Sequence, residues 1–338
     1  MKKKILAVTM SLAMMAAVSA CGGGDTKTVS DDSSSAEDSI VIGVTLHDLS
    51  SDGYAANLKG IENLAKEKGN IEIRAVSADG SAETQVGQIE DFITSGVDGI
   101  IILPVDSSAL SNAVSNAVSA DIPVVSMDRS VDGDVATATI ESDNYEHGKA
   151  AADYMLEAAE AQGMEAGDLK VLELLGDQAS SSGVERHEGF SEQCEALGIE
   201  IVAALPTNWD ADESYNSVLD GFQANNEINA IFEASDIAMH SGVSSALEQL
   251  GKYAPVGEDG HIIITTVDGG PNGIAAVSDG YIDAMAEQAL LEMGSEALNT
   301  VLSAANGETP EKLIRLNPVK VDATNADSDE LWPNMIAE

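Results

Sequence analysis

The strongest constraint on the fold comes from two short runs in which every residue is apolar, Ile100–Leu103 and Ile262–Ile264. A strand of this kind has no polar face to turn toward water, so it must be buried on both sides. Parallel sheets with helices on both faces provide that environment, whereas antiparallel sheets usually alternate polar and apolar residues. The two runs therefore favour parallel sheets covered by helices.

Strand-like runs alternate with amphipathic helical patterns from Ile40 onward, and Gly69 and Gly96 stand where two of the helices are expected to end. This alternation predicts the α/β class, with doubly wound parallel sheets and right-handed crossovers. So many strands are too many for one small sheet, and we therefore expect two lobes. The expected strands are Ile40–Leu46, Ile71–Ser77, Gly99–Val105, Ile122–Met127, Ala136–Glu141, Lys170–Leu175, Ile199–Ala204, Ala230–Ala234, Ile262–Val267 and Ile282–Ala286.

Residues 1–20 have the features of a lipoprotein signal peptide. Lys2–Lys4 give it a positive start, Ile5–Val18 is an apolar stretch too short to span a bilayer, and Val18-Ser19-Ala20-Cys21 resembles a bacterial lipobox. In that interpretation Cys21 carries the lipid and becomes the mature N-terminus; the alternative is an ordinary secretory signal with a chance cysteine. Residues 21–39 are rich in Gly, Ser, Thr and Asp, which predicts a flexible tether. We thus expect an extracytoplasmic protein that is anchored to the outer face of the cell membrane through its lipid alone.

The net charge of the chain limits the kinds of partner that it can bind. The chain has 16 Lys and Arg against 58 Asp and Glu, a net charge of −42, and removal of the signal takes away three lysines and no acid. Such an acidic chain is repelled by nucleic acid and by anionic lipid. With Cys21 used by the lipid, Cys194 is the one remaining cysteine, so no intrachain disulfide is expected. Its helical pattern favours a buried apolar residue over a nucleophile.

Acidic residues follow six of the expected strands, at the sheet edge where open parallel sheets bind their ligands. One such acid is often no more than a helix N-cap, but six favour a binding site. Carboxylates accept hydrogen bonds from vicinal hydroxyls, and Arg129, beside one of the acids, offers five donors. This chemistry fits a neutral polyhydroxyl ligand better than an anion, because the acids outnumber the arginine. The six acids are Asp106, Asp128, Asp143, Asp177, Asp236 and Asp268.

Two aromatic residues stand out in a chain that is 4% aromatic. Tyr54 opens the helix after the first strand, and Trp209 lies in the loop after Ile199–Ala204. An aromatic plane can cover the apolar face of a sugar ring; the alternatives are a core role for either residue and a lid role for Trp209. The glycine-rich run Asp268–Gly273 lacks the Lys-Ser/Thr of a P-loop, and the five histidines lack metal-ligand spacing. No cofactor or metal is therefore expected.

From about Ile40 to Ala323 the chain resembles the ribose/galactose-type periplasmic sugar-binding proteins. The resemblance rests on six segments in a characteristic order and spacing. They are Val97–Pro104, Ile122–Arg129, Glu141–Asn144, Glu185–Phe190, Ser235-Asp236 and Val267–Gly269. The resemblance implies a type I periplasmic binding fold, with two lobes joined by crossings near Ser142-Asp143, Gln288-Ala289 and Asn317-Pro318. The N-terminal lobe would comprise residues 40–142 with 289–317, and the C-terminal lobe residues 143–288 with 318–338.

The same resemblance implies ligand contacts. The implied residues are Tyr54, Asp128, Arg129, Trp209, Ser235, Asp268 and Gln288. The two aromatics match residues that cover the two faces of a sugar ring, and the Asp-Arg pair matches one that grips hydroxyls and the ring oxygen. An arginine that contacts sugar in relatives falls at Val184, whereas Arg186 matches a neighbouring arginine. The pocket is therefore expected to fit a monosaccharide other than ribose, or a cyclitol.

These features together predict a monomeric receptor of an ABC importer, which binds a neutral monosaccharide or related polyol and presents its closed form to the permease. One alternative is a ligand-presenting sensor subunit for a histidine kinase or chemoreceptor, which the residues alone do not separate from an importer. Another is a secreted enzyme that uses Asp128 and Asp268 as acid and base. The enzyme is disfavoured because Arg129 is expected to keep Asp128 ionised rather than let its pKa rise.

Overall fold

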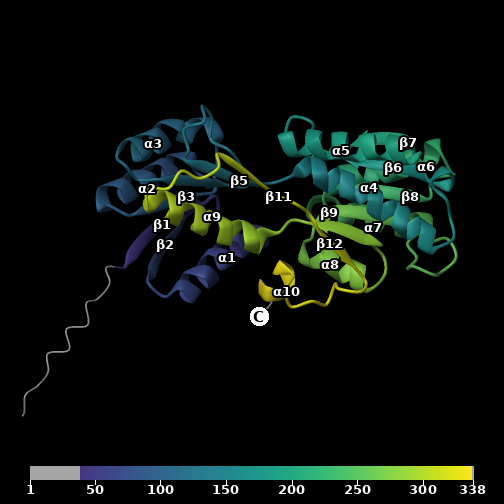
Figure 1. Ribbon diagram of the computed structural model, residues 1–338. Coiled ribbons are helices and arrows are strands. Elements are labelled where there is room, and N and C mark those ends of the chain that lie inside the picture. Colours follow the sequence, from purple (N-terminus) through teal and green to yellow (C-terminus); the bar gives the residue numbers. More distant parts are fainter. Residues whose placement is uncertain (1–38, 337–338) are drawn as a thin grey trace, which may run out of the picture. The chain divides into compact units, whose positions relative to one another are not determined.

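Two six-stranded sheets organise residues 39–336, the part of the chain that the computed structural model describes (Figure 1). Their strand orders are β11-β5-β4-β3-β1-β2 and β12-β10-β9-β8-β6-β7, and every pair is parallel except β10 with β12. The first sheet contains β1 (Ile40–Leu46), β2 (Ile71–Ser77), β3 (Gly99–Ile102), β4 (Val124–Met127), β5 (Ala138–Ser142) and β11 (Leu313–Leu316). The second contains β6 (Lys170–Leu175), β7 (Glu200–Pro206), β8 (Ala230–Glu233), β9 (Ile263–Asp268), β10 (Ala284–Glu287) and β12 (Val319–Asp322).

Helices pack on each sheet and complete two lobes. Lobe 1 is the first sheet with α1 (Asp52–Lys68), α2 (Ala82–Ser95), α3 (Ser107–Ser119) and α9 (Leu290–Ala305). Lobe 2 is the second sheet with α4 (Asn144–Ala161), α5 (Ser181–Leu197), α6 (Ala211–Ala224), α7 (Asp236–Leu250) and α8 (Pro271–Ser278). A short 3₁₀ turn, Ala166–Asp168, precedes β6. The observed architecture confirms the predicted doubly wound α/β class with two lobes.

Alternate residues of the run Ile100–Leu103 point to opposite sides of the first sheet. Ile101 and Leu103 join the apolar cluster with α1 and α9, whereas Ile100 and Ile102 join the cluster with α2 and α3, and all four are fully buried. The sheet is therefore covered on both faces, as the uninterrupted apolar run predicts. Gly69 and Gly96 end α1 and α2 with left-handed backbones (φ 83° and 65°), so the two predicted helix ends are also confirmed.

Three of the expected strands, Ile40–Leu46, Ile71–Ser77 and Lys170–Leu175, have the observed ends, and the other seven differ by a few residues. The sequence did not predict β11 and β12. Each has four residues and no apolar run, and their first residues, Leu313 and Val319, are 45% and 38% exposed. Strands this short and this exposed carry no pattern that separates them from loop.

The chain passes between the two sheets three times. It leaves lobe 1 after β5 to form α4, returns after β10 to form α9, and leaves again between β11 and β12. The joining residues are Asp143, Gln288-Ala289 and Asn317-Pro318. All three passages lie at strand ends, which makes them short connections between the two sheets.

The C-terminal segment departs from the expectation that residues 318–338 belong to the C-terminal lobe. Ala326 and Leu331 pack in the core of lobe 2, but Trp332, the first residue of α10 (Trp332–Ile336), is 1% exposed within the core of lobe 1. The helix α10 contacts both α1 and α8. Burying the indole against lobe 1 removes a large apolar area from water, which explains why the segment crosses back.

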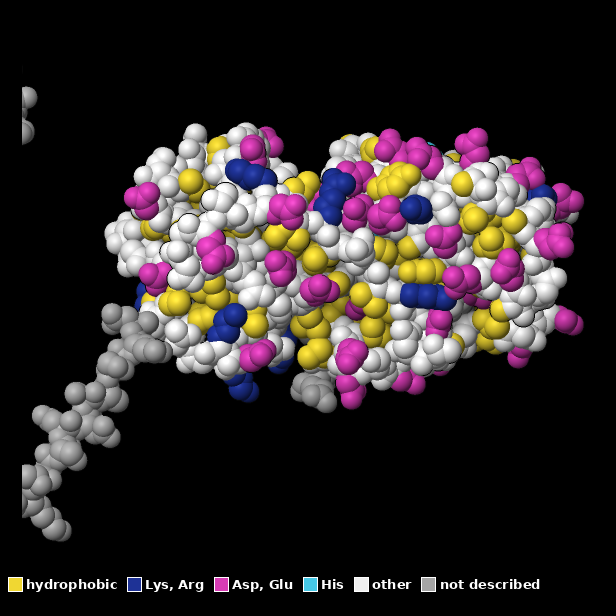
Figure 2. Space-filling model, viewed as in Figure 1, with side chains coloured by type: hydrophobic (Ala, Val, Ile, Leu, Met, Phe, Trp, Pro, Cys, Tyr) yellow, Lys and Arg dark blue, Asp and Glu magenta, His cyan; other side chains and the backbone are white. Residues whose placement is uncertain are grey.

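Acidic side chains are spread over the face shown in Figure 2, with far fewer Lys and Arg among them. Several of the basic residues are paired with acids: Lys320 Nζ lies 2.5 Å from Glu157 Oε2, and Lys170 Nζ lies 2.7 Å from Glu200 Oε2. The visible face thus gives a polyanion such as nucleic acid no extended basic surface.

Within residues 39–336, no helix combines the length and the apolar character that crossing a membrane requires. Cys194 of α5 is buried, and burial raises the pKa of its thiol to about 12, so the prediction of an unreactive core cysteine is confirmed. The signal peptide, Cys21 and residues 22–38 lie outside the described residues.

Candidate ligand-binding site

A cleft of about 940 Å³ is lined by residues from both lobes. Among these residues are Asp128, which follows β4, and Asp268, which ends β9. The cleft therefore lies at the carboxyl edge of both sheets, where open parallel sheets bind ligands. All seven residues predicted to bind ligand line this one cleft. They are Tyr54, Asp128, Arg129, Trp209, Ser235, Asp268 and Gln288.

Lobe 1 contributes a charged pair that follows β4. Arg129 Nε lies 3.5 Å from Asp128 Oδ2, and Arg129 Nη2 donates to the Tyr54 hydroxyl at 2.9 Å. Tyr54 is in the first turn of α1, as predicted. Asp128 has a left-handed backbone (φ 64°), a conformation that few non-glycine residues adopt and that Asp tolerates better than most. This turn brings a carboxylate, a guanidinium and a phenol ring together in the cleft.

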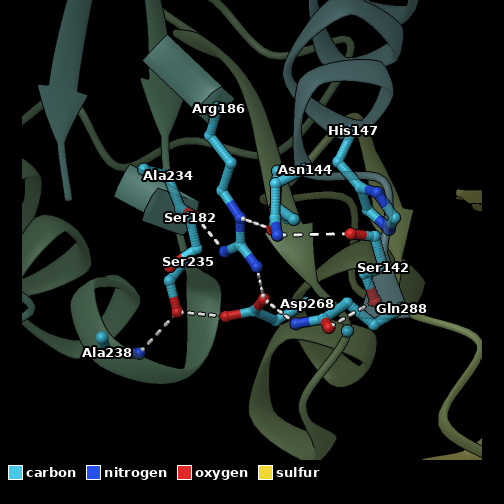
Figure 3. A network of polar contacts seen from close by, with 12 residues as sticks. Ser142, Asn144, His147, Ser182, Arg186, Ala234, Ser235, Ala238, Asp268 and Gln288 are labelled. Atoms are coloured by element: carbon cyan, nitrogen blue, oxygen red, sulfur yellow. Dashed lines mark hydrogen bonds and ion pairs between the residues drawn. The ribbon is translucent and has the colours of Figure 1, made fainter. Parts of the chain in front are cut away.

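Lobe 2 contributes a buried ion pair (Figure 3). Arg186 Nη2 lies 2.8 Å from Asp268 Oδ1, and the two side chains are 5% and 11% exposed. The same guanidinium donates to Asn144 Oδ1 at 2.9 Å and to the Ala234 carbonyl at 2.6 Å. The Ser235 hydroxyl, which caps α7, donates to Asp268 Oδ2. Both oxygens of the Asp268 carboxylate are thus bonded to side chains of lobe 2.

Gln288 connects this network to the passage between the lobes. Its Nε2 donates to Asp268 Oδ1 at 2.5 Å, and its Oε1 accepts from the Ser142 hydroxyl at 2.7 Å (Figure 3). Ser142 ends β5 in lobe 1, and Gln288 follows β10 in lobe 2. A ligand that contacts Asp268 would therefore be connected through Gln288 and Ser142 to two of the three passages between the sheets.

Trp209 belongs both to the cleft and to the packing of lobe 2. Its ring covers Gly176, where an added Cβ would lie 2.1 Å from the indole, and the Arg186 guanidinium carbon lies 5.7 Å from the ring centre. The ring also packs against the apolar core of lobe 2. The two interpretations that the sequence left open, cleft residue and core residue, therefore both describe part of its contacts.

Two of the carboxylates that line the cleft, Asp128 and Asp268, have opposite pKa shifts. Burial raises the pKa of Asp128, and Arg129 and Arg186 offset this only in part. Burial also acts on Asp268, but Arg186 and the hydrogen bonds to the carboxylate outweigh it and lower the pKa. The expectation that Arg129 prevents a rise in the pKa of Asp128 is therefore wrong. Arg129 makes one loose contact with the carboxylate and shares its guanidinium with Tyr54, which is too little to offset desolvation.

The sequence patterns did not indicate that Arg186 belongs to the site. The arginine expected to contact sugar falls at Val184, which does not line the cleft, whereas Arg186 does and is 4% exposed. A signal was present in the sequence: Arg186 shares the buried face of α5 with Gly183, Gly189 and Phe190. A buried arginine on the apolar face of a helix requires a partner, and the strand-end acids are the obvious source.

A second charged cluster in the cleft was also missed. Arg315 Nε lies 3.0 Å from Glu141 Oε1, and Arg315 Nη2 lies 3.6 Å from Glu185 Oε1. Arg315 and Glu141 are on β11 and β5 of lobe 1, whereas Glu185 is on α5 of lobe 2. The contact between Arg315 and Glu185 therefore joins the two lobes directly. The sequence does not indicate this contact, because β11 carries no recognisable strand pattern.

The six strand-end acids do not form one site. Asp128 and Asp268 line the cleft. Asp106 and Asp143 accept backbone N–H groups at the N-termini of α3 and α4 and act as helix caps. Asp236 is buried and accepts hydrogen bonds from two backbone amides of the turn after β9. The helix-cap alternative thus accounts for part of the pattern that favoured a binding site.

His147, on α4, is expected to make the stability of the fold depend on pH. The residue is fully buried, its Nδ1 lies 2.7 Å from the Asp143 carbonyl, and burial lowers its pKa from 6.5 to about 4. The unfolded chain binds the proton below pH 6.5 and the folded chain only near pH 4. We therefore expect the free energy of unfolding to fall as the pH drops through this window, by about 3 kcal/mol from this group alone.

The measurement is urea unfolding at pH 7, 5.5 and 4 of the wild type and of His147→Gln, which should lose this part of the pH dependence. His187→Gln is the matched control. The Glu173 carboxylate raises the pKa of His187, so its contribution is present at low pH and is lost as pH rises. Equal pH dependence in the wild type and His147→Gln would contradict the assignment.

Comparison with known proteins places the chain in a family. Residues 42–309 match the family model described as a periplasmic binding protein domain. The chain belongs to the periplasmic binding protein family. The family is one of binding proteins, which confirms that the chain is a binding protein and not an enzyme. The family match and the similar solved structures also confirm the type I periplasmic binding fold.

Individual relatives support this assignment. The chain is 27% identical over 320 residues to a ribose import binding protein of Bacillus subtilis, covering 95% of this chain and 99% of the relative. It is 28% identical over 270 residues to the D-allose-binding periplasmic protein of Escherichia coli, covering 77% of this chain and 83% of the relative. One similar solved structure is a periplasmic solute-binding protein of an ABC transporter from Actinobacillus succinogenes with bound D-allose. It matches with a TM-score of 0.70 and 27% sequence identity, and the match covers 85% of this chain and 99% of that chain.

Proposed function

We propose that this protein is the solute-binding subunit of an ABC importer for a neutral monosaccharide or related polyol, which binds in the cleft. The observation that carries the proposal is the arrangement of two carboxylate–arginine pairs, one from each lobe, beside two aromatic rings. Relatives and similar structures are described with ribose, D-allose, xylitol and myo-inositol, all neutral and rich in hydroxyls.

The arrangement suits hydroxyl groups. The carboxylates of Asp128 and Asp268 accept hydrogen bonds from vicinal hydroxyls, and the arginines donate to hydroxyl or ring oxygens. Each carboxylate has an arginine partner within the protein, so the cleft presents no uncompensated cation to attract an anion. The rings of Tyr54 and Trp209, on opposite lobes, provide apolar surfaces for the faces of a sugar ring.

The protein is extracytoplasmic, in keeping with the description of its family. Anchoring through a lipid on Cys21, a monomeric state and docking of the ligand-closed form on a permease are parts of the proposal. The lipobox at Val18–Cys21 supports the anchor, and the acidic surface supports a body that does not adhere to anionic lipid.

A melting-shift screen of the mature chain tests the proposal. The panel contains D-ribose, D-allose, xylitol, myo-inositol and a sugar phosphate. We expect at least one neutral member to raise the melting temperature by several degrees at millimolar concentration, because a ligand that binds the folded state alone stabilises it. No shift with any neutral member, or a larger shift with the sugar phosphate, would contradict the proposal.

Replacing Trp209 with alanine is expected to weaken binding of the best panel ligand 5- to 150-fold, since the loss of an aromatic face costs about 1–3 kcal/mol. The melting temperature should also fall by a few degrees, because the ring packs on Gly176 and on the core of lobe 2. Isothermal titration calorimetry and thermal melting measure the two effects.

Tyr215→Ala is the matched control for this variant. Tyr215 packs against the same core from α6 but does not line the cleft. We expect it to lower the melting temperature and leave the dissociation constant unchanged. If Trp209→Ala behaves like Tyr215→Ala, Trp209 acts in the core and not on the ligand.

A further inference from the structure

Lobe 1 contains two buried amide side chains whose surroundings differ. Gln85 of α2 is fully buried and satisfied: its Nε2 donates to the Leu103 carbonyl at 2.9 Å, and its Oε1 accepts from Val105 N at 2.8 Å. Asn57 of α1 is 1% exposed, and within residues 39–336 its buried Oδ1 has no hydrogen-bond partner. The first amide holds strands and helix together, whereas the second has no such role in the described structure.

Asn57 lines the cleft. It lies three residues after Tyr54 on α1, on the same side of the helix, and both residues border the cleft. Leu290, at the start of α9, borders it as well. The backbone of Asn57 is fixed by close packing of α1 on α9, because a Cβ added to Gly294 would lie 2.0 Å from the Asn57 carbonyl oxygen. Asn57 is therefore held in place at the wall of the cleft.

We propose that Asn57 is a specificity-determining residue, whose side-chain amide hydrogen-bonds a hydroxyl of the neutral ligand on the lobe 1 side, next to Tyr54. This inference rests on the proposed function of the cleft. It adds a contact that is not among the seven ligand-binding residues implied by the family resemblance. An amide both donates and accepts, so it pairs with a hydroxyl in either orientation and discriminates against a ligand that lacks one there.

The energetics of the residue support this role. A buried polar atom without a partner destabilises a fold, and asparagine is also a poor residue for a helix interior. An isosteric apolar residue at the same position would avoid both penalties. We therefore expect the fold to be less stable with Asn57 than with leucine, and a hydrogen bond to the ligand would provide the partner that the described chain lacks.

The test compares Asn57→Leu, Asn57→Ala and the control Gln85→Leu with the wild type. The probes are D-ribose, D-allose, xylitol and myo-inositol, measured by calorimetry, and the ligand-free melting temperature is measured in parallel. We expect Asn57→Leu to melt about 2–5 °C higher than the wild type without ligand and both Asn57 variants to bind the best probe at least 10-fold more weakly. Gln85→Leu should melt several degrees lower with an unchanged dissociation constant.

A lower ligand-free melting temperature for Asn57→Leu would overturn the inference, because it would show that the amide already has a stabilising partner. Unchanged binding by both Asn57 variants would also overturn it. If no probe binds the wild type, the proposed ligand class is wrong. The melting temperature of Asn57→Leu without ligand then tests the inference by itself. A value above that of the wild type supports Asn57 as a binding residue, and a value below it overturns the inference.

Discussion

Replacing Asp268 with asparagine is expected to raise the dissociation constant for the best neutral ligand at least 100-fold and to lower the free energy of unfolding by about 3–5 kcal/mol. Arg186, Ser235 and Gln288 all bond to the Asp268 carboxylate. Its loss leaves the Arg186 guanidinium, 5% exposed, without its counter-charge. Calorimetry and urea unfolding of the same preparation measure the two effects.

Asp106→Asn is the control for this variant. Asp106 also follows a strand end, but it is exposed and caps α3. Asparagine caps helices about as well as aspartate, so stability and binding should stay at wild-type values. If Asp268→Asn keeps wild-type stability, Arg186 does not depend on this carboxylate, and the network drawn in Figure 3 is not what holds the lobe 2 side of the cleft.

Replacing Trp332 with alanine is expected to lower the free energy of unfolding by about 3–5 kcal/mol, the usual range for a large buried aromatic. The indole is 1% exposed in the core of lobe 1, although the preceding residue, Leu331, packs in the core of lobe 2. The variant removes an apolar connection between the lobes as well as a part of one core. We therefore also expect a larger radius of gyration for the ligand-free protein in small-angle scattering.

Asp329→Ala, an exposed change three residues earlier, should leave both quantities unchanged. If Trp332→Ala unfolds like the wild type, the C-terminal segment does not contribute to lobe 1, and the expectation that residues 318–338 belong to the other lobe would be restored.

The sequence predicts most of the fold because burial on both faces of a strand leaves an unmistakable pattern. Runs such as Ile100–Leu103 have no polar position, and the glycines that end α1 and α2 adopt the left-handed backbone expected of them. By contrast, β11 is four residues long with an exposed first residue, and its hydrogen-bond partner β5 precedes it by more than 160 residues. Local pattern carries no trace of such a pairing.

The candidate site shows the same contrast between local features, which the sequence reveals, and long-range contacts, which it does not. Asp128 and Asp268 are visible from sequence because a strand end fixes where a residue lies in a parallel sheet. Arg186 and Asn57 are on helices, where a polar residue on a buried face is visible but its partner is not. The pKa of Asp128 could not be predicted either, since it depends on how far the cleft excludes water, and adjacency to Arg129 in sequence says nothing about that.

The chain has two tryptophans, and the structure places them where they would report different events. Trp209 borders the cleft 5.7 Å from a guanidinium, so its fluorescence should change when a ligand displaces water from the ring. Trp332 is shielded from water in lobe 1 and should emit at short wavelength until the C-terminal segment detaches. Trp209→Phe and Trp332→Phe would separate the two signals. Unlabelled protein would then give a spectroscopic readout of ligand occupancy from one indole and of the connection between the lobes from the other.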